Sequence, residues 1–216
     1  MRVIKVCVFA IVLLWVRFAS ADVIISEIMY DPASKEDPKG VIVEWVELYN
    51  SGDKAVSVEG WYLEDEDGKT TPLPKGATLK PGQAVVLVPV GMTEEEFRKA
   101  WGEGFDIYIM GGWHRPGLNG LGNNASEKNE VLSLRSPEGK VADEANYHSE
   151  GDWPEVKAGG GPSIVVKPEA LNAKANDSGK NWAMSKEGEL GAITCKKTEA
   201  FGGKDVGSPG KVATKD

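Results

Sequence analysis

The stretch VEWVELYNSGDKAVSVEGWYLEDEDG, from Val43 to Gly68, decides the kind of fold and the kind of function that this chain can have. The ranges Val41–Asn50 and Val56–Asp65 are rich in β-branched and aromatic residues and are bounded by turn residues, which is typical of short β-strands. The sequence SGD between these ranges has the residue types that favour a turn. The stretch therefore predicts two strands joined by a short turn, with its many carboxylates on the side of the sheet that faces water.

Two of these carboxylates, Glu44 and Glu47, have the residue type of a catalytic acid and base. Successive side chains of a strand point to opposite faces, so two residues three apart lie on opposite sides of the sheet. Glu44 and Glu47 therefore cannot act together on one substrate. We expect both to be hydrated carboxylates at the edge of a strand.

The run EDEDG, ending at Gly68, resembles a calcium loop in composition only. An EF-hand loop with Gly68 at its sixth position would need oxygen ligands at its first and twelfth positions, where this chain has Leu63 and Pro74. An irregular metal site using Asp65 and Asp67 stays open, but a solvated acidic turn is the favoured interpretation.

The rest of the chain shows the same pattern of short strands broken by glycine, proline, asparagine and aspartate. Further strands are predicted at Asp22–Tyr30, Gln83–Val90 and Pro162–Pro168, and a hairpin at Asn129–Tyr147. One helix is predicted in MTEEEFRKAWG, where Thr93 and Glu96 match a capping box, Phe97 and Trp101 lie one turn apart, and Gly102 ends the helix. The pattern predicts an all-β sandwich or barrel with one short inserted helix.

The N-terminus has the pattern of a signal peptide over residues 1–21. Arg2 and Lys5 precede an apolar run from Val6 to Val16, and a small-residue cleavage site ends at Ala21. Cleavage would change the formal net charge from −8 to −11, because it removes three basic residues and no acidic ones. We therefore expect a secreted or extracytoplasmic protein without a stable membrane anchor. Its acidity argues against binding nucleic acid, whose phosphates attract Lys and Arg.

Cleavage would also leave Cys195 as the last cysteine, which excludes an internal disulfide in the mature chain. The two histidines, His114 and His148, are not in a common zinc-ligand spacing, and the sequence has no serine nucleophile motif. These observations predict a protein without catalytic residues or cofactor. A metal-assisted hydrolase, with carboxylates contributed by distant loops, remains the alternative.

Aromatic residues in glycine- or proline-rich loops are the best candidates for ligand contacts. GGWHRPG places Trp113, His114 and Arg115 side by side between glycines, and GDWPEV contributes Trp153. Binding residues are often carried on loops held by a rigid scaffold. We expect these four residues to bind a glycan or an extracellular protein if the two rings are exposed. The alternative is that both rings cap the ends of the core.

Several motifs of the chain resemble the lamin-tail domain family, in the form found in secreted bacterial proteins. These are ELYN (Glu47–Asn50), Gly60-Trp61 followed by Leu63, TLKPGQ (Thr78–Gln83), the closing hairpin with the loop before it (Gly120–Tyr147), and the endings NDSGKNWAMS and GSPG. The resemblance implies an immunoglobulin-like β-sandwich. It also implies a buried core at Val46, Leu48, Trp61, Leu63 and Leu79, turns at Gly60 and Gly82, and no catalytic residue.

Together these features predict one elaborated sandwich domain over residues 22–210, with an insertion at about residues 91–116. The end of the chain, from Gly207 in GSPGKVATKD, is expected to fray, with disorder over residues 211–216. The predicted function is that of a secreted non-catalytic module for binding, adhesion or envelope structure, whose ligand the sequence does not identify.

Overall fold

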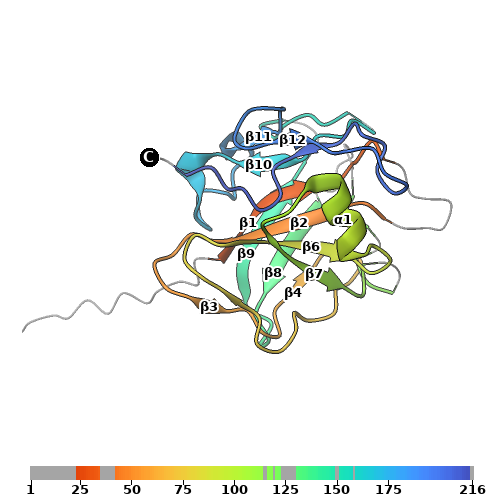
Figure 1. Cartoon of the computed structure of the whole chain (residues 1–216). Coiled ribbons are helices and arrows are strands. Elements are labelled where there is room, and N and C mark those ends of the chain that lie inside the picture. The colour runs from red at the N-terminus through yellow and green to blue at the C-terminus, as the bar shows by residue number, and fades with distance from the viewer. Residues whose placement is uncertain are drawn as a thin grey trace, which may run out of the picture.

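The computed structural model describes residues 23–34, 42–113, 116–118, 120–122, 130–148, 151–157 and 159–214. Its largest sheet has six strands in the order β11-β10-β1-β2-β6-β7 (Figure 1). These strands are β1 (Val23–Met29), β2 (Trp45–Asn50), β6 (Ala84–Pro89), β7 (Asp106–Met110), β10 (Ile164–Val166) and β11 (Trp182–Met184).

A second sheet of three antiparallel strands packs against one face of the first. It consists of β4 (Tyr62–Glu64), β8 (Glu130–Arg135) and β9 (Val141–Tyr147), in the order β4-β8-β9. Two pairs of short strands complete the described structure, β3 (Val56–Ser57) with β5 (Thr78–Leu79) and β12 (Ile193–Thr194) with β13 (Val206–Gly207). Two 3₁₀ turns span Pro168–Ala170 and Gly179–Asn181. The predicted all-β sandwich is confirmed.

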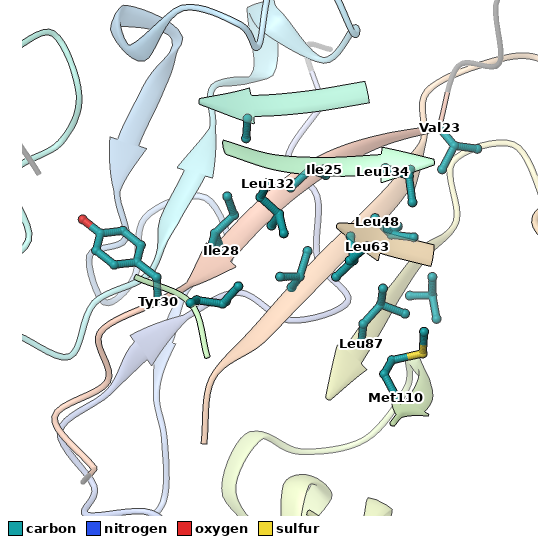
Figure 2. Packing of buried hydrophobic residues seen from close by; sticks show 14 of the residues in the cluster. Val23, Ile25, Ile28, Tyr30, Leu48, Leu63, Leu87, Met110, Leu132 and Leu134 are labelled. Carbon is teal, nitrogen blue, oxygen red and sulfur yellow. The ribbon is translucent and has the colours of Figure 1, made fainter. Parts of the chain in front are cut away.

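The main core fills the space between the two sheets (Figure 2). Ile25, Ile28 and Leu48 of the large sheet meet Leu132 and Leu134 of the small one. All of the core positions expected from the family resemblance are buried, namely Val46, Leu48, Trp61, Leu63 and Leu79. Large apolar side chains at these positions supply most of the free energy that favours folding.

An irregularity in β1 sets which of its side chains enter this core. The pairing of β1 with β2 shifts between Ile25 and Glu27, as at a β-bulge. Because a bulge adds one residue to one strand, Ile25 and Ile28 both face the small sheet although they lie three residues apart. Ser26 and Glu27 are left on the opposite side, where their hydroxyl and carboxyl groups contact residues outside the main core.

The opposite face of the large sheet is also covered. Helix α1 (Glu94–Trp101) begins with the predicted capping box, since Glu96 N–H donates to Thr93 Oγ1 and Thr93 N–H donates to Glu96 Oε2. Phe97 and Trp101 pack edge-on against Trp45 of β2, with ring centroids 6.2 and 5.6 Å apart. A second apolar cluster therefore lies between α1, this face of the sheet, and the buried residues Cys195 and Phe201.

The insertion expected at about residues 91–116 contributes a strand that the sequence pattern did not indicate. β7 pairs with β6 in parallel, which requires the chain to cross over between them through α1 (Figure 1). The exposed and buried residues of β7 do not alternate regularly because it lies at the edge of the sheet.

Cover on both faces overturns two expectations. Glu47 has no exposed surface, so the interpretation of this residue as a hydrated strand carboxylate is wrong. The GSPG sequence, expected to belong to a frayed tail, is also largely buried: Gly207, Ser208 and Pro209 are buried and Gly210 is half-buried. Among the described helices, none is long and apolar enough to cross a membrane.

Candidate functional site

The four predicted ligand-binding residues have different outcomes. Trp113 is completely buried in the main core, and its Nε1–H donates to Glu44 Oε2 at 3.1 Å. The expectation of an exposed ring is therefore wrong for Trp113, because the loop folds inward over the edge of the sandwich. His114 and Arg115 lie outside the described residues. Trp153 is partly buried and lines a pocket.

Glu44 has a structural contact in the same region. Its Oε2 accepts a second hydrogen bond from Leu121 N–H at 2.8 Å, and the residue is half-buried. Glu44 and Glu47 face opposite sides of the sheet, as the strand period predicts: Trp113, the partner of Glu44, belongs to the main core, while Glu47 lies against the C-terminal segment. The expectation that Glu44 is fully hydrated is therefore wrong too.

The predicted metal candidates are part of a turn. Asp65 Oδ1 accepts hydrogen bonds from Asp67 N–H and Gly68 N–H, at 2.8 and 2.9 Å, which closes an Asx turn. Burial raises the pKa of Asp65 to about 6, against the effect of these two donors. In the part of the chain that the structure describes, no three His, Cys, Asp or Glu residues are grouped so that they could hold a metal ion.

The pocket at Trp153 has a volume of about 520 Å³ and lies between the end of β9 and the segment before β11. Its lining residues are His148, Gly151, Asp152, Trp153, Asp177, Ser178 and Gly179. This volume is within the usual range for small-ligand pockets, about 300–1,000 Å³. The pocket offers one aromatic ring, two carboxylates, an imidazole and a hydroxyl to a ligand.

The chain holds Trp153 in place from two sides. Its ring centroid lies 5.5 Å from that of Trp182, with 38° between the ring planes. Gly179 lies so close to the ring that a Cβ atom there would be 2.6 Å from Trp153 Cγ. Only glycine fits this position without displacing the indole. The ring therefore presents its remaining surface to the pocket in a fixed orientation.

The pocket wall formed by residues 172–182 is bound to the core through Asn176. The Asn176 side chain is fully buried, and its Nδ2–H donates to Asp143 Oδ2 at 2.8 Å and to the Ile25 carbonyl at 3.3 Å. Trp182 Nε1–H donates to the Asn176 carbonyl at 2.7 Å. Asn176 begins an N-glycosylation sequence, NDS, but its buried amide is not accessible for modification in the folded protein.

The carboxylates of the pocket are solvent-exposed, so they remain available to a ligand. Asp152 Oδ2 lies 3.4 Å from Lys180 Nζ, and both side chains are largely exposed. Desolvation, followed by the charge of Glu144, raises the pKa of Asp177 from its ordinary value. Asp152 and Asp177 could not be predicted as site residues from the sequence, because they lie in separate loops and form no local pattern. The ending NDSGKNWAMS was the one available signal for this wall.

The family whose model the sequence matches agrees with this architecture. The Lamin Tail Domain family model matches residues 17–149, which excludes the pocket wall at residues 172–182. Among solved structures, a DUF4876 family protein from Bacteroides thetaiotaomicron is similar at 11% identity and a TM-score of 0.40, covering 91% of this chain and 72% of that one. No curated protein matches the sequence. Because the family model spans more than half of the chain, the protein belongs to the lamin tail domain family, whose immunoglobulin-like sandwich is the fold described above.

Proposed function

We propose that this protein is a secreted, non-catalytic binding module, and that the pocket at Trp153 holds one end of a glycan. The observation that carries the proposal is the fixed indole of Trp153 on the wall of a 520 Å³ pocket beside Asp152 and Asp177. The apolar faces of sugar rings pack on aromatic side chains, and sugar hydroxyls donate hydrogen bonds to carboxylates.

The charge of the protein narrows the class of glycan. The formal net charge, −8 for the whole chain and more negative after cleavage, and the two aspartates of the pocket disfavour acidic sugars and other polyanions, because like charges repel. Neutral or amine-bearing sugars fit this electrostatic setting. Secretion is supported by the charged start, the apolar run and the small-residue site of the first 21 residues.

The alternative, a metal-assisted hydrolase, lacks a group of three His, Cys, Asp or Glu residues that could hold a metal ion among the described residues. Asp152 and Asp177 line the pocket at Trp153 together. The other close pair of carboxylates, Glu27 and Glu47, has no exposed surface, so substrate cannot reach that pair in the folded protein. A hydrolytic site needs its acid and base within hydrogen-bond reach of a bound substrate. Binding is the function that this geometry supports better.

The proposal is tested by screening the full chain on an array of neutral, amine-bearing and acidic oligosaccharides, alongside basic peptides. We expect binding to neutral or amine-bearing sugars, with the best of these then titrated against variants. Asp177→Asn, at an exposed position, should weaken binding by about tenfold, which corresponds to one lost hydrogen bond to a charged group. Trp153→Ala should abolish binding.

Asp53→Asn is the matched control, since Asp53 is exposed in the turn after β2 and does not line the pocket. Because Trp153 also packs on Trp182, the thermal midpoint of each variant is measured beside its affinity. Sugar binding that persists in both pocket variants contradicts the proposal. Binding to basic peptides alone would replace the glycan with a protein partner.

A further inference from the structure

A pair of buried carboxylates lies outside the pocket at Trp153 and is not used by the proposed function. Glu27 of β1 and Glu47 of β2 occupy paired positions of adjacent antiparallel strands, and neither has exposed surface. Directly opposite residues on one face of such a pair have Cβ atoms about 4.5–5.5 Å apart. Two full negative charges at this separation inside a protein repel each other strongly.

The C-terminal segment, Val206–Gly210, supplies hydrogen-bond donors to both carboxylates. Ser208 N–H donates to Glu27 Oε1 at 2.8 Å and Ser208 Oγ–H donates to Glu27 Oε2 at 2.6 Å. Gly210 N–H donates to Glu47 Oε2 at 2.6 Å. The acidic pair therefore binds the segment at Ser208 and Gly210, while Val206 is bound through backbone hydrogen bonds with Gly161 and Ser163.

Three other serine hydroxyls complete the surroundings of the pair. Ser163 and Ser185 donate to Glu27 Oε1, the second of them at 3.3 Å. Ser26 Oγ–H donates to Glu47 Oε1 at 2.7 Å, and the same hydroxyl lies 3.3 Å from the Glu47 carbonyl oxygen. If Glu47 is protonated, Ser26 Oγ can accept a hydrogen bond from the carboxyl O–H and donate its own hydrogen to that carbonyl instead. The surroundings thus accommodate a proton on Glu47.

The fit of the segment over the pair is close. A Cβ atom on Gly207 would lie 2.8 Å from Trp45 Cζ2 and 3.0 Å from Glu27 Oε1. A Cβ atom on Gly210 would lie 2.2 Å from Phe105 Cβ. Both glycines therefore let the backbone approach where any side chain would hold it away. When the segment is in place, water does not reach the carboxylates.

Among the described residues, no ion pair with a cation balances the charge of the pair, since neither Glu27 nor Glu47 forms one with a Lys or Arg residue. Desolvation raises the pKa of Glu27, and desolvation followed by the charge of Glu27 raises the pKa of Glu47 well above its ordinary value.

Other titratable groups come from each element around the pair. They are Tyr49 on β2, Lys186 after β11, Asp205 and Lys211 on either side of the segment, and Arg98, Glu103 and Asp106 in the surface pocket that Gly210 lines. Arg98 contacts Glu94 and Glu103 rather than the pair. Desolvation and, second to it, the negative charge of Glu47 raise the pKa of Tyr49. The phenol of Tyr49 is therefore another acidic group close to Glu47.

We propose that Val206–Gly210 is a pH-dependent clasp, closed over Glu27 and Glu47 while the two carboxylates share one proton and released when both are charged. Release lets water hydrate the two charges, which the closed arrangement prevents. A raised carboxyl pKa in the closed state means that the closed state binds more protons than the open one. Closure is therefore strongest in acid and weakens as the pH rises through the raised pKa of the pair.

Cys195 reports on the clasp without any added probe site. It is buried, its N–H donates to the Asp205 carbonyl at 2.8 Å, and the preceding strand β12 pairs with β13 in the clasp. The test measures the rate of Cys195 alkylation by iodoacetamide in the full chain from about pH 5 to about pH 9, on either side of a raised glutamate pKa. Peptide mass spectrometry separates Cys195 from Cys7.

The comparison variant is Glu47→Gln, which keeps the size of the side chain and removes one charge. The wild-type rate divided by the variant rate at the same pH cancels the ionisation of the thiol. We expect this ratio to be near one in acid and to rise by about tenfold in alkali, the effect of one pKa unit on an opening equilibrium. Glu187→Gln, an exposed control, should match the wild type at every pH.

A ratio that stays constant with pH overturns the proposal. A second measurement needs no variant: the hydrogen-exchange protection of the Ser208 and Gly210 amides is compared with that of Val86, which lies in the buried strand β6. The clasp predicts that protection at Ser208 and Gly210 falls with rising pH while Val86 stays protected. If all three lose protection together, the whole fold opens and the clasp does not exist.

Discussion

Glu27 and Glu47 face each other at paired positions of β1 and β2 in the interior of the protein, each without exposed surface. The bulge in β1 places Glu27 on the face that carries Glu47, and the C-terminal segment seals that face. The acidic sequence around β2, which has the composition of a protein surface, thus contributes one carboxylate to the interior. The stability and the pH response of the protein both depend on such buried acids.

Trp61 should be one of the strongest single contributors to stability. It is 8% exposed, belongs to the main core, and its carbonyl accepts a hydrogen bond from Leu73 N–H at 2.7 Å. Trp61→Ala is expected to lower the free energy of unfolding by about 3–5 kcal/mol, as large aromatic deletions do. Urea denaturation measures the loss. Val90→Ala, at a position that is 50% exposed, should cost far less.

The close fit of Gly210 gives a matched pair of glycine variants. Gly210 and Gly82 have φ values of +76° and +71°, so alanine at either position carries a similar backbone strain of about 1 kcal/mol. A Cβ atom on Gly82 meets nothing within 4 Å, whereas one on Gly210 collides with Phe105. Gly210→Ala should therefore be less stable than Gly82→Ala by about 1–3 kcal/mol, the cost of overpacking. Equal midpoints in urea would show that the C-terminal segment is not seated as described.

The buried Asp143 should make the protein less stable as the pH rises toward neutrality. Burial raises the pKa of Asp143 to about 7, although the N–H groups of Ile25 and Asn176 favour its charged form. The stability that protonated Asp143 contributes is fully present below its unfolded-state pKa and is lost as the pH rises through its folded-state pKa.

The measurement compares wild-type protein with Asp143→Asn by urea denaturation at several pH values from about 4 to about 8, spanning that range. As the pH rises, the free energy of unfolding of the wild type should fall relative to that of Asp143→Asn by on the order of 4 kcal/mol, because each pKa unit corresponds to about 1.36 kcal/mol. Because Glu27 and Glu47 titrate in both proteins, their effects cancel. A difference that does not depend on pH would mean that Asp143 is charged in the folded protein throughout this range.

The mature protein should begin at Asp22. The basic residues Arg2 and Lys5, the apolar run and the Ala-Ser-Ala sequence at residues 19–21 are the features that a signal peptidase requires. Expression with export, followed by N-terminal sequencing, gives the result directly. Recovery of Met1 on the exported product would refute the expectation, and Ala21→Leu should block cleavage by removing the small residue.

Local sequence chemistry determined most of the strands, the helix and the family. The capping box at Thr93 and Glu96 acts within one helical turn, so the start of the helix could be predicted without knowledge of the rest of the chain. The aromatic and branched apolar residues of β2, and the apolar residues Trp61 and Leu63, likewise mark strands without reference to distant segments. The glycine and proline around Trp153 indicated that it lies in a loop and could contact a ligand, but they did not indicate which residues lie beside it in the pocket.

Tertiary structure alone decided which polar residues are buried and which meet. A two-residue period separates the faces of a strand, but it does not say that both faces of the large sheet are covered, as they are here by the small sheet and by α1 with the C-terminal segment. Glu27 and Glu47 are 20 residues apart, and each lies more than 160 residues from the donors of the GSPG sequence. Burial and electrostatic coupling depend on distances in space, and contacts between distant segments leave no local pattern in a single sequence.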